Sequence, residues 1–286
     1  MDEVRRFLLE DLDIRGALVR LGPSWAAMNS RRSYAEPVRA LLGELAAVTA
    51  IIGSNLKAPG RISFQLQGHG PVSMLVMDCN EKLQLRGMAK SALSADADAH
   101  VDGIDELLGD GRLVLTLQPK TAETPYQSVV PLTGSSVAAV FEHFLEQSEQ
   151  QPARLWLAAD ADTACGLFLQ KLPNADVLDP DGWDRIEALA ATVRPEELLL
   201  PPETLLTRLF NEESVRLYAP RQAVWHCPRD EEKVRNMLLS LGREEVEAML
   251  ADAEIIAVED EICGHEYRFG AEIVDELFPP AGRILH

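Results

Sequence analysis

The clearest pattern in the chain is an apolar face between residues 38 and 52. Its members recur every three or four positions, which is the period of an amphipathic helix, and Gly53 follows as a stop signal. They are Val38, Leu41, Leu42, Leu45, Val48 and Ile52. The spacing therefore predicts a long helix over residues 38–52.

Shorter segments alternate between apolar and polar residues, as half-buried strands do. The pattern is plainest where Ile62, Phe64 and Leu66 are separated by polar side chains. Strands are predicted at residues 62–67, 72–77, 83–86, 113–118, 126–132, 154–158 and 166–172. A helix is predicted at 137–144, between the strands at 126–132 and 154–158. Strands grouped between helices favour an α+β main domain over residues 1–172.

Prolines change the character of the chain after residue 172. They divide the following stretch into short helical pieces, such as 183–193 and 202–210. These pieces are apolar, so we expect them to bury a face on a neighbour, by plain packing or, alternatively, as a ligand surface. Residues 173–226 are interpreted as a helical linker over the main domain.

The last 60 residues, 227–286, form a small acidic α/β unit with 6 basic and 15 acidic side chains. Periodicity predicts helices near 234–241 and 244–250 and an extended pair at 255–258 and 267–269. Units this small commonly need a metal, a disulfide or docking on a neighbour. The expected apolar core is Val234, Met237, Leu238, Leu241, Val246, Met249, Leu250, Ile255, Ile262, Tyr267 and Phe269.

Charge and hydropathy narrow the classes of partner. The 286 residues carry a formal charge of −19, which repels a nucleic-acid backbone. No run approaches the ~18 to 20 consecutive apolar residues that cross a bilayer, and acidic residues interrupt the start where a signal peptide is apolar. We therefore expect a cytoplasmic protein without a nucleic-acid or membrane partner.

Four cysteines are too few for a disulfide scaffold in a chain of this length. Cys79 and Cys165 lie beside predicted strands without a nearby histidine, and they are interpreted as small core residues. His69, between two glycines, is interpreted as a structural turn residue. No P-loop or dinucleotide motif occurs.

Several segments, in the right order, resemble the family of the heat-shock protein of 33 kilodaltons. They are residues 64–71, 125–132, 147–150, 154–157, 208–213 and 238–242. The resemblance implies a redox-regulated, ATP-independent holdase chaperone of bacteria and organelles, whose partners are unfolding proteins and which is not an enzyme. It also implies that the activated form could be a homodimer.

One departure from the family concerns its metal. Members usually carry CxC and, about thirty residues later, CxxC, and the four thiolates hold one zinc. Here Cys-Pro-Arg stands at 227–229 and Asp-Glu-Ile-Cys at 260–263. Because Arg229 cannot bind a metal and Asp260 offers a hard oxygen, four-thiolate zinc is excluded and no cofactor is expected. Any zinc that did bind would use Cys227, Cys263, His226 and His265.

Three outcomes stay open for the two remaining cysteines and the residues that replace the others. Cys227 and Cys263 could form a disulfide, whose loop of about 37 residues would stabilise the unit by roughly 3 to 4 kcal/mol. They could equally be inert thiols. Arg229 and Asp260 could form an ion pair. A disulfide would reverse the family's usual behaviour, in which oxidation expels zinc and unfolds the terminal unit.

The sequence thus predicts a holdase that opens its terminal unit and linker under stress and exposes apolar surface. The candidate client-binding residues are Leu198, Leu199, Leu200, Leu205, Leu206, Leu209 and Phe210. Two alternatives are a constitutive protein-interaction module and a thiol hydrolase, for which His226 or His265 would supply the base.

Overall fold

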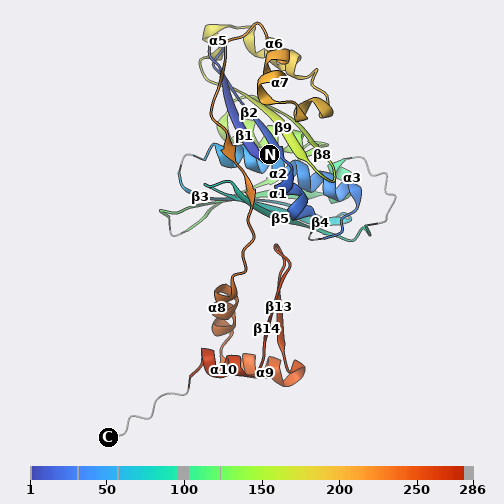
Figure 1. Ribbon diagram of the computed structural model, residues 1–286, viewed down its shortest axis with the longest axis vertical. Helices are drawn as coiled ribbons and strands as arrows, with labels where there is room; N and C mark the ends of the chain where they lie inside the picture. The colour runs from blue at the N-terminus through green and yellow to red at the C-terminus, as the bar shows by residue number, and fades with distance from the viewer. Residues whose placement is uncertain (1, 31, 57, 96–102, 123, 280–286) are drawn as a thin grey trace. The chain divides into compact units, whose positions relative to one another are not determined.

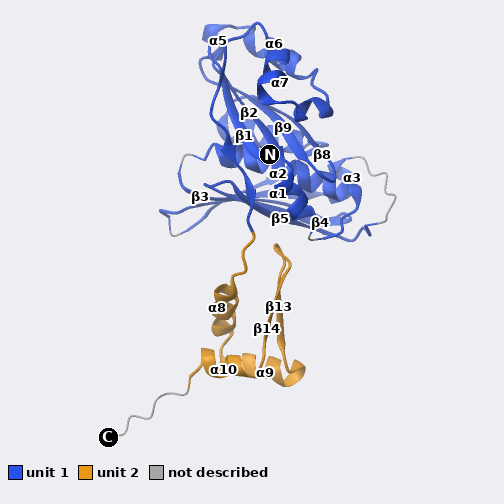
Figure 2. Ribbon diagram, in the orientation of Figure 1, with its two compact units in different colours: residues 1–226 blue, residues 227–286 orange. Residues whose placement is uncertain are grey.

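The computed structural model describes residues 2–30, 32–56, 58–95, 103–122 and 124–279 (Figure 1). The chain divides into two compact units, Met1–His226 and Cys227–His286 (Figure 2). Both units combine helices with predominantly antiparallel sheets, which confirms the α+β class.

The first sheet has the strand order β10-β1-β2-β9-β8, and β11 also pairs with β1. All of its pairings are antiparallel. The strands are β1 (Glu3–Leu9), β2 (Ile14–Leu21), β8 (Ala153–Ala159), β9 (Ala164–Lys171), β10 (Val215–Leu217) and β11 (Arg221–Gln222). The hairpin of β1 and β2 was not predicted from the sequence.

The second sheet has the order β12-β5-β4-β3-β6-β7. Among the described strands of this sheet, only the short β12 runs parallel to its neighbour, β5. The strands are β3 (Gly60–Gly68), β4 (Val72–Asn80), β5 (Gln84–Ser91), β6 (Gly111–Pro119), β7 (Tyr126–Pro131) and β12 (Val224–Trp225). The five longer strands confirm the segments predicted between residues 62 and 132.

The main core surrounds the helix α2 (Glu36–Ser54), which packs against strands of both sheets (Figure 1). By length and composition α2 would suit a membrane, but most of it is buried inside this unit, so it is a core helix. Three shorter helices are α1 (Pro23–Asn29), α3 (Ile104–Leu108) and α4 (Val137–Glu149). Phe141 of α4 packs edge-on against Phe64 of β3, with ring centroids 4.8 Å apart.

The other face of the first sheet carries a second, separate core. Residues 173–210 supply its outer layer as α5 (Ala175–Leu178), α6 (Gly182–Ala190), the 3-10 helix η1 (Pro195–Leu199) and α7 (Pro202–Leu209). Alternation along β2 divides the two cores: Ala17 and Val19 face α2, whereas Ile14 and Leu18 face the linker. The linker therefore packs as part of the first unit.

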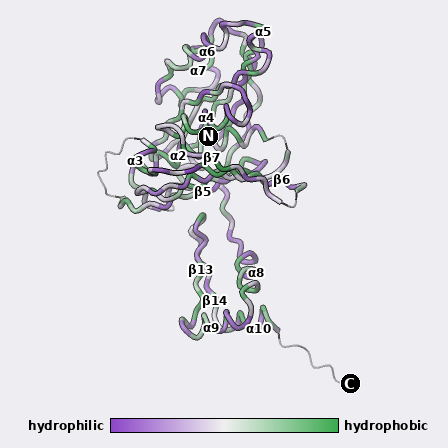
Figure 3. Tube along the Cα trace, turned by 180° about the vertical axis from the view of Figure 1, so that it is seen from behind, coloured by the Kyte–Doolittle hydropathy of each residue, from purple (hydrophilic) through white to green (hydrophobic). Residues whose placement is uncertain are grey.

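The second unit contains α8 (Glu231–Leu241), α9 (Arg243–Ala253), the hairpin of β13 (Ile256–Asp260) and β14 (His265–Phe269), and α10 (Glu272–Leu277). Hydrophobic and hydrophilic residues are interspersed along its chain (Figure 3), and the buried Val234 and Leu238 of α8 are four positions apart, on one face of the helix. The buried core is Val234, Leu238, Val246, Ile256, Tyr267, Phe269, Ile273 and Val274.

Three residues predicted for this core are instead exposed: Met237, Leu241 and Ile255. In β13 the buried residue is Ile256, one position later, because its side chain points to the opposite face of the strand. Ile273 and Val274 of α10, a helix that the sequence patterns did not reveal, belong to the core instead. Met249 and Leu250 pack against the core as partly buried residues, as does Phe278.

Candidate functional site

Cys227 and Cys263 form a disulfide in the second unit, which confirms the first of the three open outcomes. Their Cα atoms are 5.8 Å apart, within the usual range for such a bond, and 36 positions separate them in the chain. The bond joins the segment before α8 to the turn between β13 and β14. Cys263 is buried and Cys227 partly so.

Asp260 organises the turn that presents Cys263. Its Oδ1 accepts hydrogen bonds from the backbone N–H groups of Ile262 (2.9 Å) and Cys263 (3.2 Å). Its backbone carbonyl accepts a third from Gly264 (2.7 Å), whose φ of 64° is a conformation that glycine adopts without strain. Asp260, which stands where the family resemblance implies a cysteine, thus has a role as a turn-capping residue.

Arg229 contacts Glu266 and Tyr267 rather than Asp260. Its Nη2 donates to the carbonyl oxygen of Glu266 (2.6 Å), and its guanidinium lies 4.8 Å from the centroid of the Tyr267 ring. A stacked guanidinium of this kind is worth about 0.5–1 kcal/mol at an exposed site. The predicted ion pair between Arg229 and Asp260 is therefore wrong, and Arg229 instead forms a hydrogen bond to the backbone of β14.

Two more hydrogen bonds attach the same segment to β14. The N–H of Asp230 donates to the Tyr267 hydroxyl (2.8 Å), while the Asp230 carboxylate caps α8 by accepting from the N–H of Lys233 (3.0 Å). Nε2 of His265 lies 2.8 Å from the carbonyl oxygen of Cys227. We call residues 227–230 with the disulfide and these contacts the closure. Its hydrogen bonds involve His265 and Tyr267, and the sequence patterns did not indicate these hydrogen bonds.

The closure does not fit zinc. Both sulfurs are in the disulfide, and the ring of His265 is bonded to a backbone carbonyl. His226 lies in the first unit, where its backbone N–H donates to Leu85. Within the described ranges no three histidine, cysteine, aspartate or glutamate residues lie close enough together to hold a metal ion.

The other two cysteines are buried in the first unit. Burial raises the pKa of the Cys79 thiol to about 12 and that of Cys165 to about 11. Burial and a raised pKa favour the protonated thiol at neutral pH, in keeping with small core residues. The ring of His69 lies 3.0 Å from the carbonyl oxygen of Asp110, in keeping with a structural turn residue.

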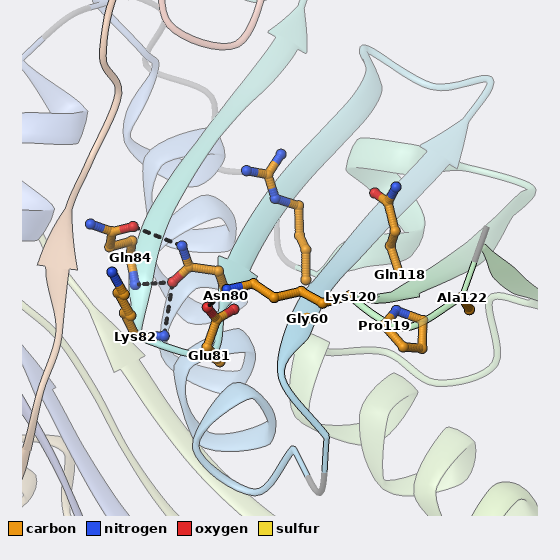
Figure 4. A pocket seen from close by; sticks show the side chains of 10 residues that line it. Gly60, Asn80, Glu81, Lys82, Gln84, Gln118, Pro119, Lys120 and Ala122 are labelled. Carbon is orange, nitrogen blue, oxygen red and sulfur yellow. Dashed lines mark hydrogen bonds and ion pairs between the residues drawn. The ribbon is translucent and has the colours of Figure 1, made fainter. Parts of the chain in front are cut away.

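A polar pocket of about 510 Å³ opens beside the turn between β4 and β5 (Figure 4). In it Lys120 pairs with Glu81, and the Asn80 side chain accepts hydrogen bonds from the backbone of Lys82 and Gln84. None of the described residues lining it is a cysteine, serine or histidine. The pocket therefore offers no thiol nucleophile. The hydrolase alternative needed Cys227 or Cys263, whose sulfurs are joined in the disulfide, and it is not favoured.

The candidate client-binding residues meet in the second core of the first unit. Leu198, Leu205, Leu206, Leu209 and Phe210 are at most 8% exposed, packed on the first sheet. The remaining two lie at its margin: Leu200 is partly buried, and Leu199 is 36% exposed.

Polar contacts at the margin fasten this layer to the sheet. Arg20 of β2 donates to the carbonyl oxygen of Leu200 (2.9 Å), and Arg5 of β1 pairs with Glu203 (2.9 Å). Because exposed ion pairs contribute only about 0–1 kcal/mol each, apolar burial is the main attachment of the linker.

Comparisons with known proteins agree with this architecture. The family model described as "Hsp33 protein" matches residues 2–270. The 33 kDa chaperonin of Methylobacillus flagellatus is 39% identical over 280 residues, covering 97% of this chain and 94% of that protein. The 33 kDa chaperonin of Vibrio cholerae is 37% identical over 293 residues, covering 99% and 98%.

The crystal structure of the 33 kDa chaperonin from Thermotoga maritima shares the fold, with a TM-score of 0.82 and 22% identity over 97% of this chain and 98% of that one. Fold and matches together define a chaperone with a sheet-based main unit, a packed linker and a small terminal unit. The chain belongs to the Hsp33 family.

Proposed function

We propose that this chaperone is an ATP-independent holdase whose client-binding surface is the apolar interface between the linker and the first sheet. The observation that carries the proposal is the separation of the two cores: the linker residues bury their apolar side chains on the face opposite α2. The linker can therefore leave while the main core stays packed. Both sides of the interface would then be exposed, as a patch that captures apolar segments of unfolding proteins.

The second unit is proposed as the gate. It follows β12 directly in the chain, and among its described residues the core cluster has only eight buried apolar members. A unit with so small a core is marginal, so it opens early under thermal stress, before the linker is released. The acidic charge of the chain, −19, would keep the opened form and its clients in solution.

Redox control in this chain is proposed to run opposite to that of a zinc-holding relative. The disulfide closes the loop between Cys227 and Cys263, which stabilises the folded unit by about 3 to 4 kcal/mol through the entropy of the open chain. Reduction would remove that contribution and lower the temperature at which the unit opens. Oxidant alone would leave the closed state in place.

The remaining features of the proposal are a cytoplasmic location, no catalytic activity, no bound cofactor and no nucleic-acid or membrane partner. Unfolding proteins of many sequences are the clients, since an apolar surface recognises no particular sequence. This breadth separates a holdase from a constitutive interaction module, which binds one partner without stress.

Light scattering of a heat-aggregating model protein tests the proposal. We expect the oxidised chain to suppress aggregation only after heating, and the reduced chain to do so from a lower temperature. The Cys227→Ser, Cys263→Ser double variant should behave like the reduced chain under both conditions. No suppression under any condition would refute the holdase, whereas stronger suppression after peroxide treatment at room temperature would refute the reversed control.

A further inference from the structure

The edge strand β7 is chemically unusual in this acidic chain. It ends the second sheet and, in the part of the chain that the structure describes, pairs only with β6. Residues 124–136, which include it, contain no charged side chain, although 26% of the whole chain is charged. Sheet edges are usually protected from pairing with other chains by lysines, bulges or a covering element. No charged side chain in residues 124–136 protects this edge.

The register fixes which backbone groups of β7 point away from the sheet. The N–H of Leu132 donates to Gly111 of β6 (3.0 Å), and hydrogen-bonded pairs alternate along an antiparallel ladder. The N–H and C=O groups of Tyr126, Ser128 and Val130 therefore face β6. Those of Gln127 and Val129 face outward.

Two prolines limit this open edge. Pro131 occupies the next outward position, where it has a carbonyl but no N–H, and Pro125 immediately precedes the strand. The edge thus offers two adjacent donors, at Gln127 and Val129, between two residues that cannot donate. A short extended segment fits this arrangement, while a long strand could not pair along its full length.

The side chains beside these donors are neutral and partly apolar. Tyr126 is 62% exposed and Val129 57% exposed. Val129 lies in register with Val114 of β6, which lies in register with Gln65 of β3, so a neutral row leads from the edge onto the sheet. An apolar segment can therefore pack beside this strand without desolvating a charged side chain of β7.

We propose that the β7 edge binds a short, extended, uncharged segment of an unfolding client by strand addition at Gln127 and Val129. The inference rests on the proposed holdase function and names a second contact for the client, outside the linker interface. Backbone pairing accepts many sequences, as a holdase requires, and the exposed Tyr126 and Val129 select for apolar side chains. Because the edge is exposed in the closed structure, it is available before the linker opens.

Fluorescence anisotropy on the oxidised full chain at room temperature tests the proposal. The probe is a capped octapeptide of alternating valine and threonine that carries an uncharged fluorophore, so that it has no net charge. Val129→Lys places a charge at the edge, and Val129→Pro removes one outward donor without removing a bond to β6. We expect either substitution to weaken binding at least fivefold. Val177→Lys, at a residue of α5 that is 81% exposed, is the control for added charge and should change binding less than twofold.

A second measurement keeps the proposal testable if a variant folds poorly. Amide hydrogen exchange of the wild-type chain should show Gln127 and Val129 slowed by the peptide, while the already bonded Ser128 changes little. Unaltered peptide affinity in the Val129 variants, or no protection at these two amides, would overturn the proposal.

Two further outcomes are distinguishable. A concentration-dependent dimer that Val129→Lys abolishes, seen by light scattering after size exclusion, would identify a second copy of this chain as the occupant and refute the client assignment. If heated wild-type chain suppresses aggregation but the peptide binds elsewhere, only the strand-addition proposal fails. If it suppresses no aggregation, the proposed function itself fails.

Discussion

The ring of Phe210, just after α7, lies 6.3 Å from the ring of Phe7 in β1. Both side chains are 1% exposed. This contact spans two parts of the chain about two hundred residues apart, and it joins the linker to the face of the first sheet opposite α2. In the proposed function this is the interface that opens while the main core stays packed.

Phe210→Ala is expected to release the linker. Truncating a buried phenylalanine typically costs about 3–5 kcal/mol, through lost burial and the cavity left behind. Because Phe210 contacts the second core and not the main one, the loss should fall on the linker interface. We expect aggregation suppression without heating and faster proteolysis within residues 173–210.

Leu199→Ala is the matched control for Phe210→Ala, since Leu199 belongs to the same layer but is 36% exposed. It should leave both the proteolysis rate and the temperature of activation nearly unchanged. A Phe210→Ala chain that is cut faster yet stays inactive until heated would show that the linker interface is not the client-binding surface.

Thiol counting and reduction test the closure. The native oxidised chain should react with no thiol reagent, because Cys79 and Cys165 are buried and their pKa values are raised to about 12 and about 11. Denaturation without reductant should expose two thiols, and denaturation with reductant four. Reduction of the native chain should lower the free energy of unfolding of the second unit by about 3 to 4 kcal/mol. Two reactive thiols in the native chain would contradict the disulfide.

Much of the fold could be predicted because most elements have one buried face. The helix at 38–52 and the strands between 62 and 132 were read correctly from their periods. The hairpin of β1 and β2 was missed, although β8 and β9 of the same sheet were predicted at 154–158 and 166–172. Val4 of β1 enters one core while Phe7 and Leu9 enter the other, so the alternation that marks a strand is lost.

The site was predictable in composition but less so in geometry. The family spacing drew attention to Cys227 and Cys263, and a disulfide was one of the outcomes it allowed. The hydrogen bond of Arg229 to Glu266 and its cation–π contact with Tyr267 could not be foreseen, because they depend on which face of β14 meets residues 227–230. Spacing along the chain carries no information about that face.

Arg229→Cys with Asp260→Cys should restore a zinc site. The two substitutions recreate CxC and CxxC at the family's spacing, in a unit where Cys227 and Cys263 already lie close together. We expect the reduced double variant to bind about one equivalent of zinc, with a cobalt-substituted form showing thiolate-to-metal charge transfer. The wild-type chain and an Arg229→Ser, Asp260→Ser variant should retain clearly less than one equivalent. Failure of the cysteine variant to bind metal would show that the backbone no longer holds the four positions together.

Glu44, on α2, makes the stability of the first unit depend on pH. Burial raises the pKa of its carboxyl from 4.5 to about 7, so between these values the folded chain binds a proton that the unfolded chain has released. Stability therefore falls as pH rises from about 5 to 7 and levels off above that. Glu44→Gln removes this titration. The free energy of unfolding of the variant, relative to that of the wild type, should therefore rise by about 2 kcal/mol from pH 5 to pH 8.

Denaturant unfolding of both chains at pH 5 and pH 8 measures this difference. Burial also raises the pKa of Glu142, but that group titrates in both chains and cancels in the comparison. Because Glu44 belongs to the helix between the two sheets, the effect should appear in the unfolding of the first unit and leave the reduction-sensitive transition of the second unit unmoved. Equal pH dependence in the two chains would mean that the Glu44 carboxylate is ionised in the folded state at pH 5, and that α2 is more accessible to water than its burial indicates.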